Sequence, residues 1–346
     1  MRKITIIITL IFLFTGVACK KKVDYFNKAN TEVNKGNYEK AIEYYTQALT
    51  KNPKDTLAYL NRGSVYAKMN NFNGAITDYM MALQLDSTNF NTWSLIADAK
   101  YQLKDNVAAI NFYTVSLKLN PANWQAYFNM ALAKENSGQK LAALFDYDRC
   151  IIYNNKYTLA YYNRGILKYS LGDFQGAYND FNTSITLDQK FGEAYFNRGN
   201  LQIQLHSNEN AALQDYNLAL QLNPQLAPAY INRANIYFTA KEFRKAIDDY
   251  NLAIQLDSTT MLAYYGRGLT KYYLKDYAGA IADLDKTNLL DPQMAKAYFF
   301  KACLKKDQGD MAGAMADFST SGQLGYMAAF DSLQKFTLLE QNKNSK

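Results

Sequence analysis

The sequence predicts an all-α fold in which antiparallel helix pairs stack side by side into a solenoid. Three observations lead to this expectation. Near-copies of residues 194–199 (AYFNRG) recur at steps of 34 residues, a period typical of solenoid repeats. Small and large apolar residues recur at helical spacing within each copy, and glycine or proline stands where each helix is expected to end. Because one helix pair cannot bury its apolar face alone, we expect the pairs to share a continuous core.

The first 18 residues are predicted to be a targeting segment. Arg2 and Lys3 precede an apolar run at 4–14, which is too short to span a bilayer and has the order of a secretory signal. Small residues at 15–18 then lead to Cys19. A retained membrane anchor is the alternative, but the small residues before Cys19 are typical of a cleavage site.

This segment resembles a bacterial lipoprotein signal, in which the cysteine after the cut is lipid-modified, although Gly16 stands where that family usually has leucine. The resemblance implies removal of 1–18, lipidation of Cys19, and an exported protein held on a membrane by acyl chains such as palmitate. Residues 19–24 then join the lipidated cysteine, through three lysines, to the first repeat. Lys20 offers no acidic retention signal, which favours the outer membrane and leaves the periplasmic or surface face open.

Nine repeats are expected between residues 22 and 326, each made of two helices. We place them at 22–55, 56–89, 90–123, 124–157, 158–191, 192–226, 227–260, 261–294 and 295–326. The first helix is expected to begin at an aromatic residue such as Tyr59, with glycine or alanine four positions later. The sixth repeat is one residue longer, and we expect the extra residue in the turn around 206–210.

These columns resemble the tetratricopeptide repeat: an aromatic residue, a small residue, a turn glycine, alanine, an aromatic, alanine, then Asp/Asn-Pro. The resemblance covers about nine-tenths of the mature chain. It implies a right-handed superhelical solenoid with a concave groove lined by the first helices. Residues 327–340, with apolar Phe330, Leu333, Phe336 and Leu339, are predicted as a capping helix, and 341–346 as a polar tail.

The sequence gives little support for catalysis, so we expect no enzyme, metal or cofactor. The single histidine, His206, is expected in a solvent-facing turn, and no Cys/His cluster, nucleophile elbow or phosphate-binding loop is found. Cys150 and Cys303 lie far apart in the chain and are not expected to pair. The net charge of +7 is mixed in sign along the helices, which gives no nucleic-acid footprint.

Two charged columns run through the repeats. Acidic residues recur at Asp78, Asp146, Asp180, Asp215, Asp249, Asp283 and Asp317, and basic residues at Lys28, Arg62, Arg164, Arg198, Arg233, Arg267 and Lys301. In the third repeat both positions are apolar, as Ile96 and Phe112. We expect the columns to form structural ion pairs; whether each pair lies within one repeat or joins two is open, and a ligand-binding arginine row is the alternative.

A column of asparagines is the feature of the sequence that most strongly suggests a binding site. It holds Asn27, Asn61, Asn129, Asn163, Asn197 and Asn232, mostly preceded by an apolar residue. An amide can pair with a peptide backbone whatever its sequence, and such ladders resemble those of repeat proteins that bind extended polypeptides. The predicted partner-binding residues are Asn61, Phe128, Asn129, Tyr162, Asn163, Phe196, Asn197, Ile231, Asn232 and Tyr265. The alternative is that the amides bond neighbouring helices and only set the spacing of the repeats.

The sequence therefore favours a membrane-anchored scaffold that binds a protein partner or peptide in its groove. By resemblance, such lipoproteins serve envelope assembly, secretion or enzyme recruitment. A module that binds a glycan or another ligand of the cell envelope is the second hypothesis, because aromatic-lined grooves also stack on sugar rings.

Overall fold

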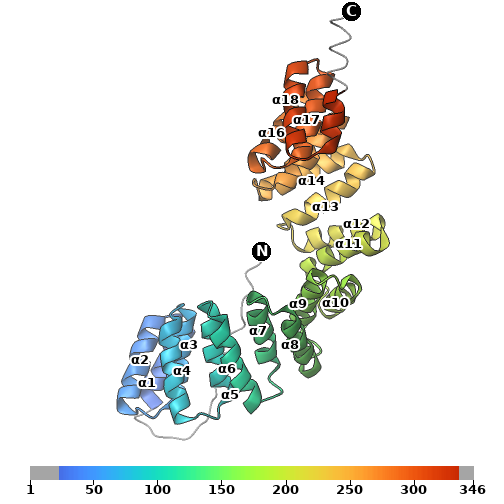
Figure 1. Ribbon diagram of the computed structural model, residues 1–346. Helices are drawn as coiled ribbons and strands as arrows, with labels where there is room; N and C mark the ends of the chain where they lie inside the picture. The colour runs from blue at the N-terminus through green and yellow to red at the C-terminus, as the bar shows by residue number, and fades with distance from the viewer. Residues whose placement is uncertain (1–22, 335–346) are drawn as a thin grey trace, which may run out of the picture. The chain divides into compact units, whose positions relative to one another are not determined.

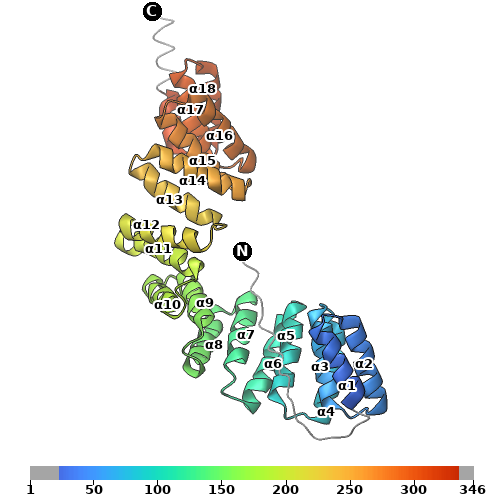
Figure 2. The same ribbon diagram turned by 180° about the vertical axis from the view of Figure 1, so that it is seen from behind.

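The computed structural model describes residues 23–334. Every regular element in this range is a helix (Figures 1 and 2). This confirms the predicted all-α fold of helix pairs. The predictions for 1–18, Cys19, the lysines that follow it, the end of the capping helix and the polar tail fall outside the described residues.

The chain divides into two compact units, residues 1–180 and 181–346, with the division inside α10. The first unit contains α1 (Val23–Asn34), α2 (Tyr38–Lys51), α3 (Thr56–Lys68), α4 (Phe72–Leu85), α5 (Phe90–Gln102), α6 (Asn106–Leu119), α7 (Trp124–Asn136), α8 (Lys140–Tyr153), α9 (Thr158–Ser170) and the start of α10 (Phe174–Leu187). Within this unit α1 and α2, α3 and α4, α5 and α6, and α7 and α8 pack as pairs, and each pair packs through its second helix against the first helix of the next pair.

The second unit repeats this arrangement. It contains α11 (Gly192–His206), α12 (Glu209–Leu222), α13 (Ala227–Thr239), α14 (Phe243–Leu256), α15 (Met261–Tyr273), α16 (Tyr277–Leu290), α17 (Ala295–Asp307), α18 (Met311–Gln323) and a helical segment at 327–334. In that segment Ala329 and Leu333 pack on the core of the last repeat, whereas Phe330 is 46% exposed.

Local chemistry explains where the helices begin and end. The first helices after α1 start three residues before the aromatic that was expected to open them. In some of them a polar residue caps the added turn: Asp55 accepts the amide of Ala58, and Asn123 that of Ala126. Others, such as α9 and α13, begin at the same position without a side-chain cap. The turn inside a repeat needs one residue with positive φ. Gly172 fills this position in the fifth repeat.

The sixth repeat differs from the sequence-based expectation. The extra residue does not lengthen the turn; α11 runs to His206 and is 15 residues long, whereas the first helices of the neighbouring repeats have 13. Ser207 then takes the left-handed conformation at φ 46°.

Small residues let the helices of a pair approach closely around a buried aromatic. The alanine near the start of each second helix is fully buried, and Tyr79 and Tyr216 are 1% exposed. A Cβ placed on Gly63 would come within 2.7 Å of the Tyr79 ring, and one on Gly199 within 2.8 Å of the Tyr216 ring. These two glycines are therefore required by packing.

Both described cysteines are free. Cys150 on α8 is fully buried, and Cys303 on α17 is partly buried.

Candidate functional site

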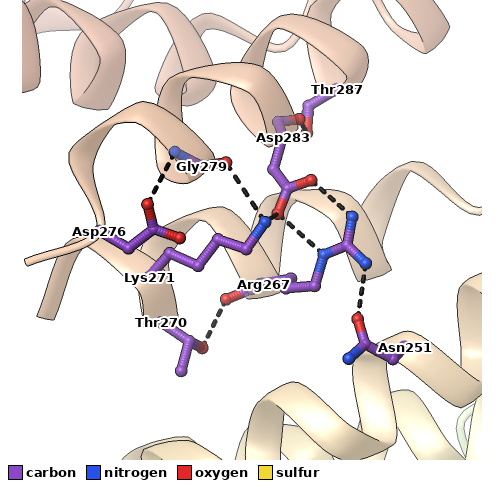
Figure 3. Close-up of polar contacts among 9 residues, drawn as sticks. Asn251, Arg267, Thr270, Lys271, Asp276, Gly279, Asp283 and Thr287 are labelled. Atoms are coloured by element: carbon purple, nitrogen blue, oxygen red, sulfur yellow. Dashed lines mark hydrogen bonds and ion pairs between the residues drawn. The ribbon is translucent and has the colours of Figure 1, made fainter. Parts of the chain in front are cut away.

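The two charged columns form ion pairs inside single repeats. In the eighth repeat, the Arg267 guanidinium on α15 donates through Nε and Nη2 to both carboxylate oxygens of Asp283 on α16, at 2.8 and 2.6 Å (Figure 3). Lys271 Nζ lies 2.8 Å from the same carboxylate. The same two-point contact recurs in Arg62–Asp78, Arg164–Asp180, Arg198–Asp215 and Arg233–Asp249.

The remaining guanidinium nitrogen bonds the preceding repeat. Nη1 of Arg267 donates to Asn251 at 2.6 Å, and Nη1 of Arg233 to Asn217 at 2.7 Å. The equivalent acceptors are Thr46 for Arg62, Asp148 for Arg164 and Asn182 for Arg198. The arginine column is thus fully engaged in structure, which confirms the ion-pair prediction and answers the open question: the pair lies within one repeat, and the third contact joins two.

The third and fourth repeats replace this arrangement. Ile96 is fully buried, and Phe112 stacks near Trp93 with ring centroids 5.8 Å apart, so an apolar contact stands where other repeats have ions. In the fourth repeat Asp146 pairs instead with Lys134 at 2.6 Å.

A second polar system links tyrosines of the second helices to the next repeat. The hydroxyl of Tyr113 on α6 donates to Asp98 Oδ1 on α5 at 2.5 Å, and Asn129 Nδ2 on α7 donates to the same oxygen at 2.9 Å. The same three-residue arrangement occurs as Tyr45–Asn30–Asn61 and Tyr216–Asn200–Asn232. Each network fastens one helix pair to the first helix of the next.

One repeat position indicates these tyrosine hydrogen bonds in the sequence, although they were not predicted. The position three residues after the asparagine column is polar in five of the six repeats whose second helix has the tyrosine, as Asn30, Ser64, Asp98, Asn200 and Asn235. In the fourth repeat it is Leu132, and the Tyr147 hydroxyl donates to Glu135 on α7 instead. The same position is Ile166, Leu269 or Cys303 in the repeats where phenylalanine or leucine replaces that tyrosine. A hydroxyl buried on a second helix therefore predicts its acceptor on the first.

Some of the predicted binding residues bond or pack within the fold, and others do not. Three amides of the column, those of Asn61, Asn129 and Asn232, donate to the preceding repeat. Asn163 is partly buried and its side chain has no polar partner among the described residues. Tyr162 and Asn197 make contacts of their own.

The apolar members of the predicted set belong to the core. Phe128 and Ile231 are 4% and 7% exposed, and Phe128 packs edge-on against Tyr157. Phe196 and Tyr265 are partly buried against other core residues. Their burial favours a packing role, and the binding role predicted for them stays a prediction.

The first unit has a pocket on the face made by first helices. It lies between α3, α5 and α7, has a volume of about 120 Å³, and includes two members of the predicted set, Asn61 and Asn129. Its lining is Leu57, Leu60, Asn61, Ser64, Asn89, Asn91, Thr92, Ser94, Leu95, Asp98, Asn123, Gln125, Ala126 and Asn129. This pocket therefore lies in the second to fourth repeats.

Asp98 is the charged residue of this lining and is 7% exposed. Burial raises the pKa of its carboxyl to about 7, against the opposing effect of the hydrogen bonds from Tyr113 and Asn129. The other buried aspartates of the described chain each lie beside an arginine or lysine; Asp98 does not.

Asn91 and Gln125 also line this pocket and were not predicted. They occupy the same position in successive repeats, just after the start of α5 and α7, and both are partly exposed. Their side-chain amides make no hydrogen bond within the described part of the chain. Leucine fills the same position in the second and fifth repeats, as Leu57 and Leu159, so no continuous column drew attention to it.

A more open hollow lies in the second unit. It is lined by first-helix residues of α11 and α13, with Glu209 and Tyr216 from α12. Asn200 and Asn232 in its wall already bond one another.

Among residues 23–334, no group of three or more His, Cys, Asp and Glu is arranged to hold a metal ion. In the same range no helix has the length and apolar character that crossing a membrane requires. His206 ends α11 and is exposed.

Comparison with known proteins agrees with this architecture. Models of the tetratricopeptide repeat match residues 29–70, 56–89, 162–227 and 227–259. Over these residues the predicted resemblance to the tetratricopeptide repeat is confirmed. No curated protein matches the chain.

Solved structures share the fold at low identity. The C-terminal part of a TPR repeat-containing protein from Cytophaga hutchinsonii has a TM-score of 0.58 at 16% identity, over 70% of this chain and 98% of that one. A tetratricopeptide repeat protein from Parabacteroides merdae has a TM-score of 0.51 at 23% identity, over 71% and 97%. A chain of the APC/C hetero-tetramer Cut9-Hcn1 has a TM-score of 0.54 at 17% identity, over 81% of this chain and 55% of that one. These similarities establish the fold.

Proposed function

We propose that this chain of tetratricopeptide repeats is a non-catalytic scaffold that binds an extended segment of a partner protein between α3, α5 and α7. The observation that carries the proposal is the pair of free amides, Asn91 and Gln125, at one repeat position beside a pocket. An amide offers a donor and an acceptor, so two of them at successive repeats can pair with the main chain of an extended peptide. Association with other chains is compatible with this fold, since one solved structure that shares it is a hetero-tetramer.

The chemistry of the lining favours a polypeptide over a glycan. Sugar rings are recognised by stacking on aromatic faces, and none of the residues that line this pocket is aromatic. The tyrosines and phenylalanines that suggested sugar binding from the sequence pack mostly in the core or between helices.

We further propose that Cys19 carries the lipid anchor and that the scaffold acts in the cell envelope. The support is the order of the N-terminal sequence: a basic start, an apolar run, small residues, and a cysteine followed by lysines. The outer membrane is the preferred location, and envelope assembly, secretion or enzyme recruitment is the expected context.

The test is crosslinked co-purification from membranes with the double variant Asn91→Ala, Gln125→Ala. Both side chains are free of hydrogen bonds within the described chain, so the variant should keep its helical circular dichroism and its unfolding midpoint. We expect a partner captured by the wild type to be lost. The matched control is Gln221→Ala, which removes an exposed side-chain amide from the second helix α12, outside this pocket. Retention of the partner by the double variant would contradict the proposed site.

A further inference from the structure

The pocket between α3, α5 and α7 contains a buried carboxylate that the fold does not neutralise. Asp98 lines it at 7% exposure, without an arginine or lysine partner among the described residues. Ionising a carboxylate in such surroundings is unfavourable unless a cation compensates it. The other buried aspartates show what this chain normally does: each has its cation in the same repeat.

Packing alone does not require an acid at this position. Asn30, Asn200 and Asn235 occupy it in other repeats, and each accepts the same tyrosine hydrogen bond with an amide oxygen. Asn200 also accepts the amide of the next repeat, as Asp98 does. An asparagine would therefore make both contacts of Asp98 without the cost of a buried charge.

The size of the pocket limits what could compensate Asp98. A cavity of roughly 150 Å³ holds one benzene ring, so about 120 Å³ accepts one side chain and not a folded surface. A side chain entering it would come from a peptide whose main chain lies along Asn91 and Gln125 at the edge of the same lining.

The hydrogen bonds already made by Asp98 favour an ammonium group over a guanidinium. Both donors, the Tyr113 hydroxyl and the Asn129 amide, bond Oδ1, which occupies the two acceptor positions of that oxygen. The two-point contact of arginine needs one position on each oxygen, whereas an ammonium is a compact charge that can pair with Oδ2 alone. Asn61 lines the same pocket and bonds Asn30 through its amide nitrogen, so its amide oxygen is left as an acceptor for another ammonium hydrogen.

We infer that this pocket selects a lysine side chain of the bound polypeptide, with Asp98 as its counter-ion. The inference rests on the proposed function, since it names the residue that the groove recognises.

The test uses the full-length chain and pools of short random-sequence peptides with one fixed central residue: lysine, arginine, acetyl-lysine or norleucine. Binding is measured by fluorescence anisotropy. We expect the lysine pool to bind about tenfold more tightly than the other three pools, as a charge-assisted hydrogen bond provides. Asp98→Asn should bind the lysine pool as weakly as the acetyl-lysine pool, and Glu39→Gln, an exposed acid on α2, should keep the preference.

Each other outcome has a defined meaning. Equal binding of the lysine and acetyl-lysine pools, or a lysine preference that survives Asp98→Asn, would overturn the inference and leave the proposed function standing. A stronger arginine pool would overturn the choice of ammonium. Cadaverine, a free amine, should compete only weakly because it lacks a main chain; competition as strong as that of the peptide would make the ligand a small amine. Failure of every pool to bind would count against the proposed groove itself.

Discussion

Asp98 should make the stability of the protein depend on pH. The groups that face it are Tyr113 from α6, Tyr79 from α4 and Asn129 from α7, none of them cationic. Its pKa is about 7 in the folded state and 3.8 for an ordinary aspartate. The folded chain therefore keeps a proton that the unfolded chain releases between about pH 4 and 7, so the free energy of unfolding falls as the pH rises through that window.

We predict that Asp98→Asn removes this dependence. At pH 8.5 the variant should be more stable than the wild type by roughly 2–4 kcal/mol, since each pKa unit corresponds to about 1.4 kcal/mol. At pH 4.5 the difference should shrink to about 1 kcal/mol, because Asp98 is then protonated in the folded state while the unfolded chain, just above the ordinary aspartate pKa, is still mostly ionised. Urea unfolding at the two pH values measures both; the same difference at both would show that Asp98 titrates normally.

Residue-scale prediction from the sequence succeeded for the ions, whereas it left two roles open for the amides. Arginine and aspartate pair within one repeat, 16 or 17 residues apart, so two parallel columns sufficed. The asparagine column mixes two roles, and the residue 31 positions upstream distinguishes them. Asn129 follows Asp98 and is bonded to it, whereas Asn163 follows Leu132 and has no acceptor there. Aligning equivalent positions of the repeats does not show this partner, because it lies at a different position in the preceding repeat.

At the scale of the helix, the turn inside each repeat is set by one residue with positive φ. Glycine holds it in Gly36, Gly138, Gly172 and Gly309, and another residue in Asn70, Lys104, Ser207, Lys241 and Lys275. After α13, the amide of Lys241 bonds the carbonyl of Phe238, and the amide of Glu242 bonds that of Tyr237. This is the Schellman ending, in which glycine is preferred because it has no Cβ.

We predict that Lys241→Gly stabilises the protein by up to about 1 kcal/mol, because it removes the steric cost of a left-handed lysine. The reverse change in the fifth repeat, Gly172→Lys, should destabilise by a similar amount. Thermal unfolding followed by circular dichroism measures both. Equal and opposite effects would establish the conformation of the turn as the cause, whereas two destabilising changes would indicate that the Lys241 side chain contributes more than its backbone costs.

The helices themselves were predictable because their determinants are local and repeated. Their first residues were not, since a cap such as Asp55 lies outside the column of aromatics and its effect depends on the bond to Ala58. The long helix α11 was missed for the same reason. Counting one extra residue does not show whether a helix or a turn takes it up.

At the scale of the whole molecule, the proposed anchor makes a direct prediction. Cys19→Ser should move the protein from the membrane fraction to the soluble fraction and abolish labelling by a palmitate analogue, because the acyl chains would have no attachment point. The control is Cys303→Ser, which removes a thiol from α17 and should change neither result. A Cys19→Ser protein that stays in the membrane fraction without label would point to retention of the N-terminal segment as an uncleaved anchor.

Within the described residues, each compact unit contains one free thiol whose rate of alkylation can be measured. Cys150 belongs to the first unit and Cys303 to the second. Burial raises the pKa of the Cys150 thiol to about 12, so it reacts with an alkylating reagent almost only when α8 comes away from its neighbours. The pKa of Cys303 is also raised by burial. With Cys19 acylated or replaced by serine, the rate at which Cys150 gains the mass of the reagent would report how often the first unit opens around α8, and the rate at which the partly buried Cys303 gains it would report the exposure of α17 in the second unit.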